Sequence, residues 1–112
     1  MAIKLNLNNA LGGVGDPYTK EDNDRDASPY VVKALLRQLV NVVGVAQQDI
    51  TVFDASRPIV NCLYNRIYYE TYPADPLVEE FSQIHYVDSL GGATGREQVV
   101  PSSTIMYFSD GT

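Results

Sequence analysis

The chain has one cysteine, one histidine and no tryptophan among its 112 residues. Cys62 alone cannot form an internal disulfide, and a cluster ligated by several cysteines is excluded. Because His85 is the only histidine, a metal site built on several imidazoles is excluded as well. No apolar run approaches the roughly 20 residues of a membrane-spanning helix, and the chain opens without the pattern of a signal peptide. The sequence therefore predicts no membrane segment and leaves the cellular compartment open.

Basic residues are also scarce, with 8 Lys and Arg against 14 Asp and Glu, for a net charge of −6. Without a basic stripe, neither nucleic acid nor an anionic membrane surface is an expected partner. The length predicts a single domain over residues 1–112, small for a complete doubly wound fold. The chain stops just after a strand-like run, so we expect a partial domain, a fragment of a longer one.

The stretch from Ser28 to residue 53 predicts a helix followed by a buried strand. Ser28 is a good N-cap, Pro29 suits the first helical position, and Gly44 is a typical helix stop. Residues 50–53 are β-branched or aromatic, which is typical of a strand. Within the helix, spacing of three and four predicts an apolar face made by Val32, Leu35, Leu36, Leu39 and Val43. The same spacing puts Lys33, Arg37 and Asn41 on the opposite face.

Residues 3–7 alternate apolar and polar side chains and predict the first strand, parallel to the strand at 50–53. A helix between two parallel strands completes a βαβ unit, and the carboxyl ends of such strands meet at one edge, where ligands bind. The predicted ligand-binding residues at this edge are Asn6, Asn8, Asn9, Asp54, Ser56 and Arg57. Arg57 would clamp an anion, and Asp54 is the one candidate for a general base.

Downstream, Pro58 and Pro73 delimit a predicted helix over residues 58–72, and Asp75-Pro76 predicts a helical turn at 77–81. Residues 84–87, 98–100 and 104–108 have the composition of strands. Residues 91–96 predict a hairpin-type connection or an anion site formed by loop amides with Arg96. The expected fold is α/β, with a mixed sheet, a parallel βαβ core and a β-rich carboxyl-terminal end.

The loop over residues 8–27 is unusually long, and we expect it to form a rim or lid over the ligand edge. Its glycines do not match a dinucleotide-binding loop. Its acidic half offers weak metal candidates, Asp22, Asp24 and Asp26, at the spacing that opens an EF-hand loop. That pattern fails further on, where Ala27 and Lys33 replace the required glycine and glutamate. A solvated acidic loop is the alternative.

Several segments resemble the bacterial domain-of-unknown-function family 362. They are Ile3-Lys4-Leu5-Asn6-Leu7-Asn8-Asn9, Asp26-Ala27-Ser28-Pro29, Leu39-Val40-x-x-x-Gly44-Val45 and Asp49-Ile50-Thr51-Val52-x-Asp54-Ala55. The resemblance covers most of residues 2–110 and implies an α/β domain without an established reaction. Members of that family are usually longer, and some carry a ferredoxin-like cysteine motif that is missing here. The resemblance thus also implies a shortened member or a fragment.

The run Asp54-Ala55-Ser56-Arg57-Pro58 is similar to an element in the amino-terminal domain of nickel-pincer lactate racemases. That similarity implies that Asp54 and Arg57 line a pocket for a metal-bound cofactor. This sequence has no second histidine-bearing loop, which puts racemase activity in doubt. The alternative is structural: Asp54 caps the following helix and Arg57 pairs with it.

Three functions stay open on these grounds. The first is a small domain that binds a small anionic ligand or a metal-bound cofactor at the carboxyl edge of its sheet. The second is a structural or oligomerisation scaffold without a ligand, and the third is a partial enzyme that uses Asp54 as a base. We also expect a homo-oligomer, because a short α/β chain leaves a sheet edge or apolar patch to be covered.

Overall fold

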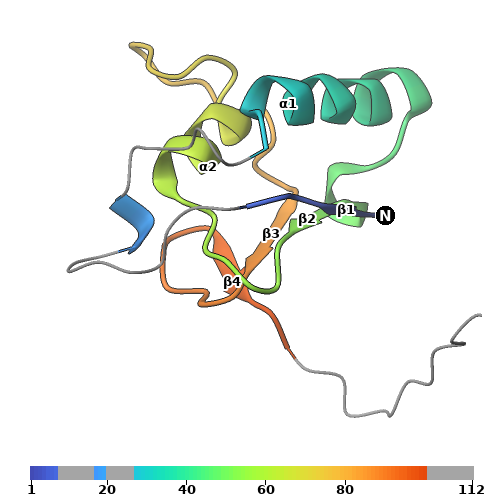
Figure 1. Cartoon of the computed structure of the whole chain (residues 1–112). Coiled ribbons are helices and arrows are strands. Elements are labelled where there is room, and N and C mark those ends of the chain that lie inside the picture. Colours follow the sequence, from blue (N-terminus) through green and yellow to red (C-terminus); the bar gives the residue numbers. More distant parts are fainter. Residues whose placement is uncertain (8–16, 20–26, 101–112) are drawn as a thin grey trace, which may run out of the picture.

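The computed structural model describes residues 1–7, 17–19 and 27–100, and all the elements named here lie among these residues (Figure 1). The strands are β1 (Ala2–Lys4), β2 (Thr51–Phe53), β3 (His85–Asp88) and β4 (Arg96–Gln98). The two α-helices are α1 (Pro29–Arg37) and α2 (Asn61–Tyr68). Short helical turns are η1 (Pro17–Thr19), η2 (Gln38–Val43) and η3 (Gln47–Asp49). Among these residues, no helix is long and apolar enough to cross a membrane.

The four described strands form one parallel sheet in the order β1-β2-β3-β4. The predicted α/β fold with a parallel βαβ core is therefore confirmed, with α1 between β1 and β2. The predicted strand at 98–100 lies two residues earlier, and the one at 104–108 is outside the described residues. The prediction of a hairpin-type connection is wrong, because residues 89–95 join two parallel strands. Parallel pairs usually need a crossover of about a dozen residues or more, so the connection over residues 89–95 is unusually short.

The central helix begins and ends where the sequence predicts. Ser28 has extended N-cap geometry, and its carbonyl accepts the first helical bond from Val32 N–H at 3.1 Å, but its hydroxyl makes no capping bond. The last six residues, η2, widen to π geometry, and Gly44 ends them at φ 89° and ψ 23°. Only glycine adopts this left-handed conformation without a Cβ penalty, which explains why the helix ends here.

The predicted faces of this helix are only partly correct. Val32 and Leu36 are buried against the sheet, whereas Leu35 is 45% exposed and Val43 68% exposed. Lys33, predicted on the polar face, is 7% exposed. Its Nζ donates to the main-chain oxygens of Tyr69 and Glu70, the latter at 2.8 Å. Carbonyls at and just after a helix C-terminus lack partners within the helix, so a lysine from a neighbouring helix can satisfy them here.

The predicted helix over 58–72 is shorter, and the predicted helical turn at 77–81 is wrong. Residues 58–60 stay extended because Ile59 N–H donates to the Asp88 carboxylate at 2.9 Å, which places the N-cap at Val60. Residues 77–81 run beside the end of α2 instead of coiling. There Glu70 N–H donates to Val78 O at 2.7 Å, and Glu80 N–H donates to Tyr68 O at 2.9 Å.

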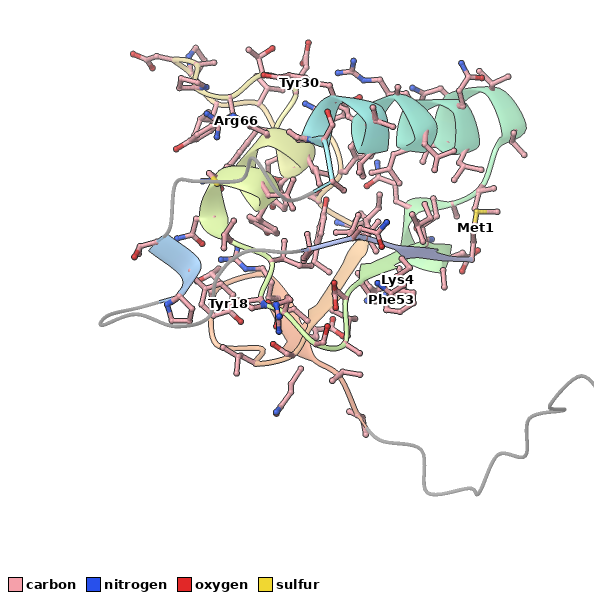
Figure 2. All side chains as sticks on the ribbon, in the orientation of Figure 1. Met1, Lys4, Tyr18, Tyr30, Phe53 and Arg66 are labelled. Atoms are coloured by element: carbon pink, nitrogen blue, oxygen red, sulfur yellow. The ribbon has the colours of Figure 1, made fainter. Side chains whose placement is uncertain are left out.

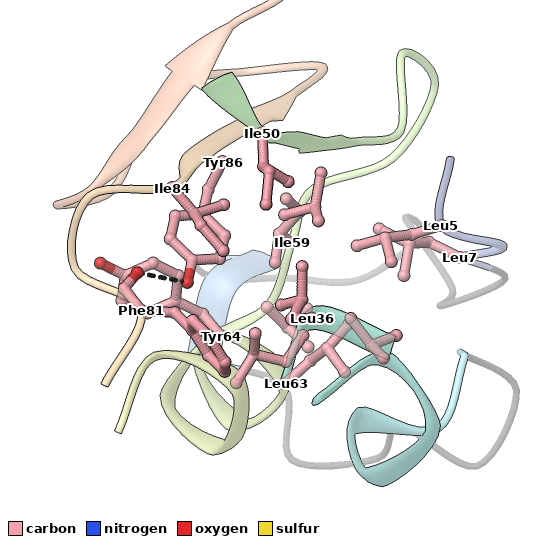
Figure 3. Packing of buried hydrophobic residues seen from close by; sticks show 14 residues of the cluster. Leu5, Leu7, Leu36, Ile50, Ile59, Leu63, Tyr64, Phe81, Ile84 and Tyr86 are labelled. Carbon is pink, nitrogen blue, oxygen red and sulfur yellow. Dashed lines mark hydrogen bonds between the residues drawn. The ribbon is translucent and has the colours of Figure 1, made fainter. Parts of the chain in front are cut away.

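Both α-helices lie on one side of the sheet (Figure 1). Between them and the sheet is the apolar core, in which Tyr86 donates its hydroxyl to Phe81 O at 2.8 Å (Figure 3). The buried cluster comprises Leu5, Leu7, Val32, Leu36, Ile50, Val52, Ile59, Val60, Leu63, Tyr64, Ile67, Phe81, Ile84 and Tyr86. Side chains alternate along strands, so every second strand residue points away from this core.

Candidate functional site

The carboxyl edge of the sheet is where the sequence predicts a ligand. Parallel pairing of β1 with β2 brings Asn6 and Asp54 to this edge, and Leu7 N–H donates to Asp54 Oδ2 at 3.2 Å. Ala27 N–H donates to Asn6 O at 2.8 Å, so the chain returns to the end of β1 after the long loop. Asn8 and Asn9 lie outside the described residues. Their place in the site stays a prediction.

Asp54 is a buried carboxylate, 3% exposed, whose oxygens already have donors. Oδ1 accepts from the backbone N–H of Ser56 at 2.8 Å and from its hydroxyl at 2.9 Å. Lys4 Nζ lies 3.8 Å from Oδ2. Burial alone would raise the pKa of Asp54, but the bonds from Ser56 and Leu7 and the Lys4 charge outweigh it and lower that pKa. A carboxylate held in its ionised form is a weak general base near neutral pH.

Arg57 does not pair with Asp54 within the part of the chain that the structure describes. Its Nη1 donates to Ser56 O at 3.3 Å, while its Nε is buried without a hydrogen-bond partner among the described residues. The structural alternative drawn from the sequence, in which Asp54 caps the next helix and pairs with Arg57, is therefore wrong. Asp54 closes a local turn with Ser56, and the next helix begins at Asn61.

A second buried carboxylate, Asp88 at the end of β3, was not predicted as a site residue. It is fully buried, and Oδ1 accepts from the N–H groups of Leu90 at 3.1 Å and Gly91 at 2.7 Å. Oδ2 accepts from Ile59 N–H at 2.9 Å and from the Tyr18 hydroxyl, also at 2.9 Å. One carboxylate thus joins four segments of the chain: η1, the lead into α2, β3 and the glycine-rich loop.

The amides of the glycine-rich loop are used in the same network. Gly92 N–H donates to the Tyr18 hydroxyl at 2.9 Å, beside the Leu90 and Gly91 bonds to Asp88. Backbone N–H groups in such a loop form an anion-binding concavity. The anion that these amides hold is the chain's own Asp88 carboxylate. An aspartate two and three residues before the donating amides is a local turn pattern, but Tyr18 is 70 residues away and gives no sequence signal.

Arg96, on β4, completes this network from the core side and is 6% exposed. Its guanidinium carbon lies 5.0 Å from the centre of the Tyr18 ring and 4.2 Å from that of Tyr64, and Nη2 donates to Asn61 Oδ1. Burial raises the pKa of both tyrosines, although the Arg96 charge opposes this. Both hydroxyls therefore stay protonated at neutral pH, and the cation stacks on neutral rings.

The metal candidates Asp22, Asp24 and Asp26 are outside the described residues, so that prediction stays open. Within the described ranges, no three His, Cys, Asp or Glu side chains gather as a metal site. His85 begins β3 and so lies at the amino edge of the sheet, away from Asp54.

An open hollow of about 150 Å³ lies in the segment after α2, away from the carboxyl edge. Ligand pockets typically measure about 300–1,000 Å³. The hollow is lined by Glu70, Thr71, Ala74, Pro76 and Val78.

No family model, curated protein or solved structure matches this chain. The resemblances to family 362 and to the racemase element stay predictions.

Proposed function

We propose that this chain is a non-catalytic scaffold domain that takes no small-molecule ligand at its carboxyl edge and associates through the face of its sheet that the described helices leave uncovered. The observation that carries the proposal is that donors of the chain itself already occupy both buried carboxylates of this edge. Asp54 and Asp88 are both buried and accept hydrogen bonds from within the chain. Groups that hold loops together this way are poorly available to bind or transform a substrate.

The second support is the single helical layer. Parallel sheets almost always have both faces covered, because their strands carry apolar residues on both sides. Here the described helices cover one face (Figure 1). The opposite face carries Phe53 and Val87, which are only half-buried. An association domain is the function class that such a face supports.

Anion binding at Arg57 is the second candidate. It is favoured by the buried Arg57 Nε, which has no hydrogen-bond partner among the described residues. The charge of Arg57 also forms no ion pair within that part of the chain. An anion bound bidentately by Arg57 would supply both a hydrogen-bond acceptor for Nε and an opposite charge for the guanidinium group.

Thermal unfolding with added ligand separates the two functions. The probes are inorganic phosphate, acetate and divalent metal chlorides, each against sodium chloride at equal ionic strength. A ligand at 100 times its Kd stabilises by about 2.7 kcal/mol, which would raise Tm by about 10 °C in a domain of this size. The scaffold function predicts no ligand-specific shift.

Two arginine variants locate any shift that does occur. Arg37 is 45% exposed and pairs with Glu80 at 2.7 Å, so Arg37→Ala removes the same charge away from the edge. A shift that is lost in Arg57→Ala and kept in Arg37→Ala would establish the anion site and refute the scaffold. A shift kept in both variants would also refute it, by revealing a ligand site elsewhere. No shift in the parent protein would remove the Arg57 candidate.

A further inference from the structure

The sheet face that the described helices leave uncovered carries one charge of each sign at its two borders. The pairing register aligns Lys4 with Phe53, Phe53 with Val87, and Val87 with Glu97. This row crosses all four strands, with a cation on β1, apolar side chains in the middle and an anion on β4. We call it the cross-strand row. Figure 2 shows Lys4 and Phe53 on the side of the strands that faces away from α1.

Both charges of the row are accessible. The Lys4 side chain is 58% exposed and that of Glu97 is 64% exposed. Each has a partner in its own chain: Lys4 lies 3.8 Å from Asp54, and Glu97 lies 3.3 Å from His85 on the same face. These contacts hold the two charges at opposite borders of the face and leave room for a second partner.

We propose that the cross-strand row is a self-complementary surface on which a second copy of this chain packs face to face. The two-fold axis runs parallel to the strands, between β2 and β3. This operation lays β1 of one copy over β4 of the other, so Lys4 meets Glu97 of the second copy, twice by symmetry. In the middle, Phe53 meets Val87 of the second copy. The inference rests on the proposed scaffold function and names the partner.

The charge pattern selects this orientation over the other two-fold arrangement. An axis across the strands would lay β1 over β1 and β4 over β4, which brings Lys4 near Lys4 and Glu97 near Glu97. Like charges across an interface are strongly unfavourable. Only the axis parallel to the strands matches opposite charges at both borders and apolar side chains at the centre.

A rival surface exists on the outer face of α1 and η2. Val31 is 70% exposed, Leu35 45% and Val42 71%. These side chains are apolar, but no charge pattern among them selects a partner or an orientation. The outer helix face therefore serves as the comparison surface in the test.

The predicted dimer is weak and sensitive to salt. Four strands spaced about 4.8 Å apart, each a few residues of about 3.3 Å, give a face far below the roughly 800 Å² per partner of a standard interface. We expect a Kd between about 10 μM and 1 mM at low salt. Salt screens the exposed Lys4–Glu97 pairs, so the Kd should rise when salt is added.

Charge reversal followed by mixing tests the geometry by sedimentation equilibrium. Lys4→Glu alone and Glu97→Lys alone each create two like-charge contacts, so each should raise the Kd at least about tenfold. A mixture of the two variants forms a heterodimer in which both contacts are again opposite in sign. The mixture should therefore associate about as well as the parent protein. Circular dichroism of each variant confirms that the chain is folded, and Val42→Glu on the outer helix face is the control.

Three results would overturn the inference. The first is a parent protein that stays monomeric up to about 1 mM at low salt. The second is a mixture that associates no better than its separate components. The third is loss of the dimer in Val42→Glu, which would assign association to the outer helix face. If the dimer inference fails, the failure appears in sedimentation equilibrium. If the scaffold function fails, the failure appears as a Tm that depends on ligand, so the two failures can be told apart.

Discussion

Replacement of Asp88 by asparagine tests whether the carboxyl edge is a structural network. The amide keeps one acceptor oxygen, which can still serve Leu90 and Gly91. In the parent protein, Ile59 N–H donates to the carboxylate at 2.9 Å. In the variant, the NH2 group of the asparagine faces this N–H, so the N–H has no acceptor. A buried N–H left without an acceptor costs about 1–3 kcal/mol, and loss of the negative charge weakens the remaining bonds by about 1 kcal/mol more.

We therefore expect Asp88→Asn to lower the free energy of unfolding by about 3 kcal/mol, a large part of the roughly 5–15 kcal/mol of a typical domain. Urea denaturation followed by far-ultraviolet circular dichroism measures the loss. The matched control is Asp75→Asn, the same chemical change on an exposed loop, which should stay within about 0.5 kcal/mol of the parent.

If Asp88→Asn does not fold, Tyr18→Phe tests the same network more gently. It removes one donor to the carboxylate and the acceptor for Gly92 N–H, so we expect a loss of about 1–2 kcal/mol. A loss below about 1 kcal/mol in a folded Asp88→Asn protein would refute the reasoning, because the carboxylate would then not be holding the loops together.

Two further predictions concern the same edge. Because the pKa of Asp54 is lowered, its contribution to stability is complete once pH is well above the unfolded-state pKa of about 3.9 and is lost as pH falls from there through the lower folded-state pKa. The difference in unfolding free energy between the parent and Asp54→Asn should therefore shrink below pH 4; a constant difference would contradict this. Gly95→Ala should destabilise by several kcal/mol, since φ is +80° and the new Cβ would overlap the Tyr64 hydroxyl. Gly44→Ala, at φ +89° with open space around the new Cβ, should lower the free energy of unfolding by only about 1 kcal/mol. Urea titration of both variants measures this, and equal losses in Gly95→Ala and Gly44→Ala would refute the argument.

Local patterns predicted the elements near the centre of the chain. Proline and glycine mark both ends of the helix from Pro29 to Gly44, and short runs of β-branched and aromatic residues mark β2 and β3. The parallel pairing of β1 and β2 followed from one crossover helix between them. Such features depend on residues close together in sequence, which is why spacing alone could find them.

Features that depend on tertiary contacts could not be predicted. Periodicity placed Lys33 on the solvent side, but the free carbonyls at the end of α2 draw it inward. Proline placement suggested that the second helix begins at residue 58, but the Asp88 carboxylate captures Ile59 N–H and keeps the chain extended. At the candidate site, Asp54 was found from its position after a strand. Asp88 was missed because two of its four donor residues, Tyr18 and Ile59, lie far away in the sequence.

The Tyr18–Asp88 contact also bears on how the chain folds. It joins residues 70 apart in sequence, and the described strands of the sheet all pair in parallel. Non-local contacts of this kind slow folding, because a long loop must close before the contact stabilises anything. We expect the Asp88 network to form after the folding transition state. Substitutions there would then accelerate unfolding and leave the folding rate nearly unchanged. On this view Asp88 controls how long the folded molecule persists.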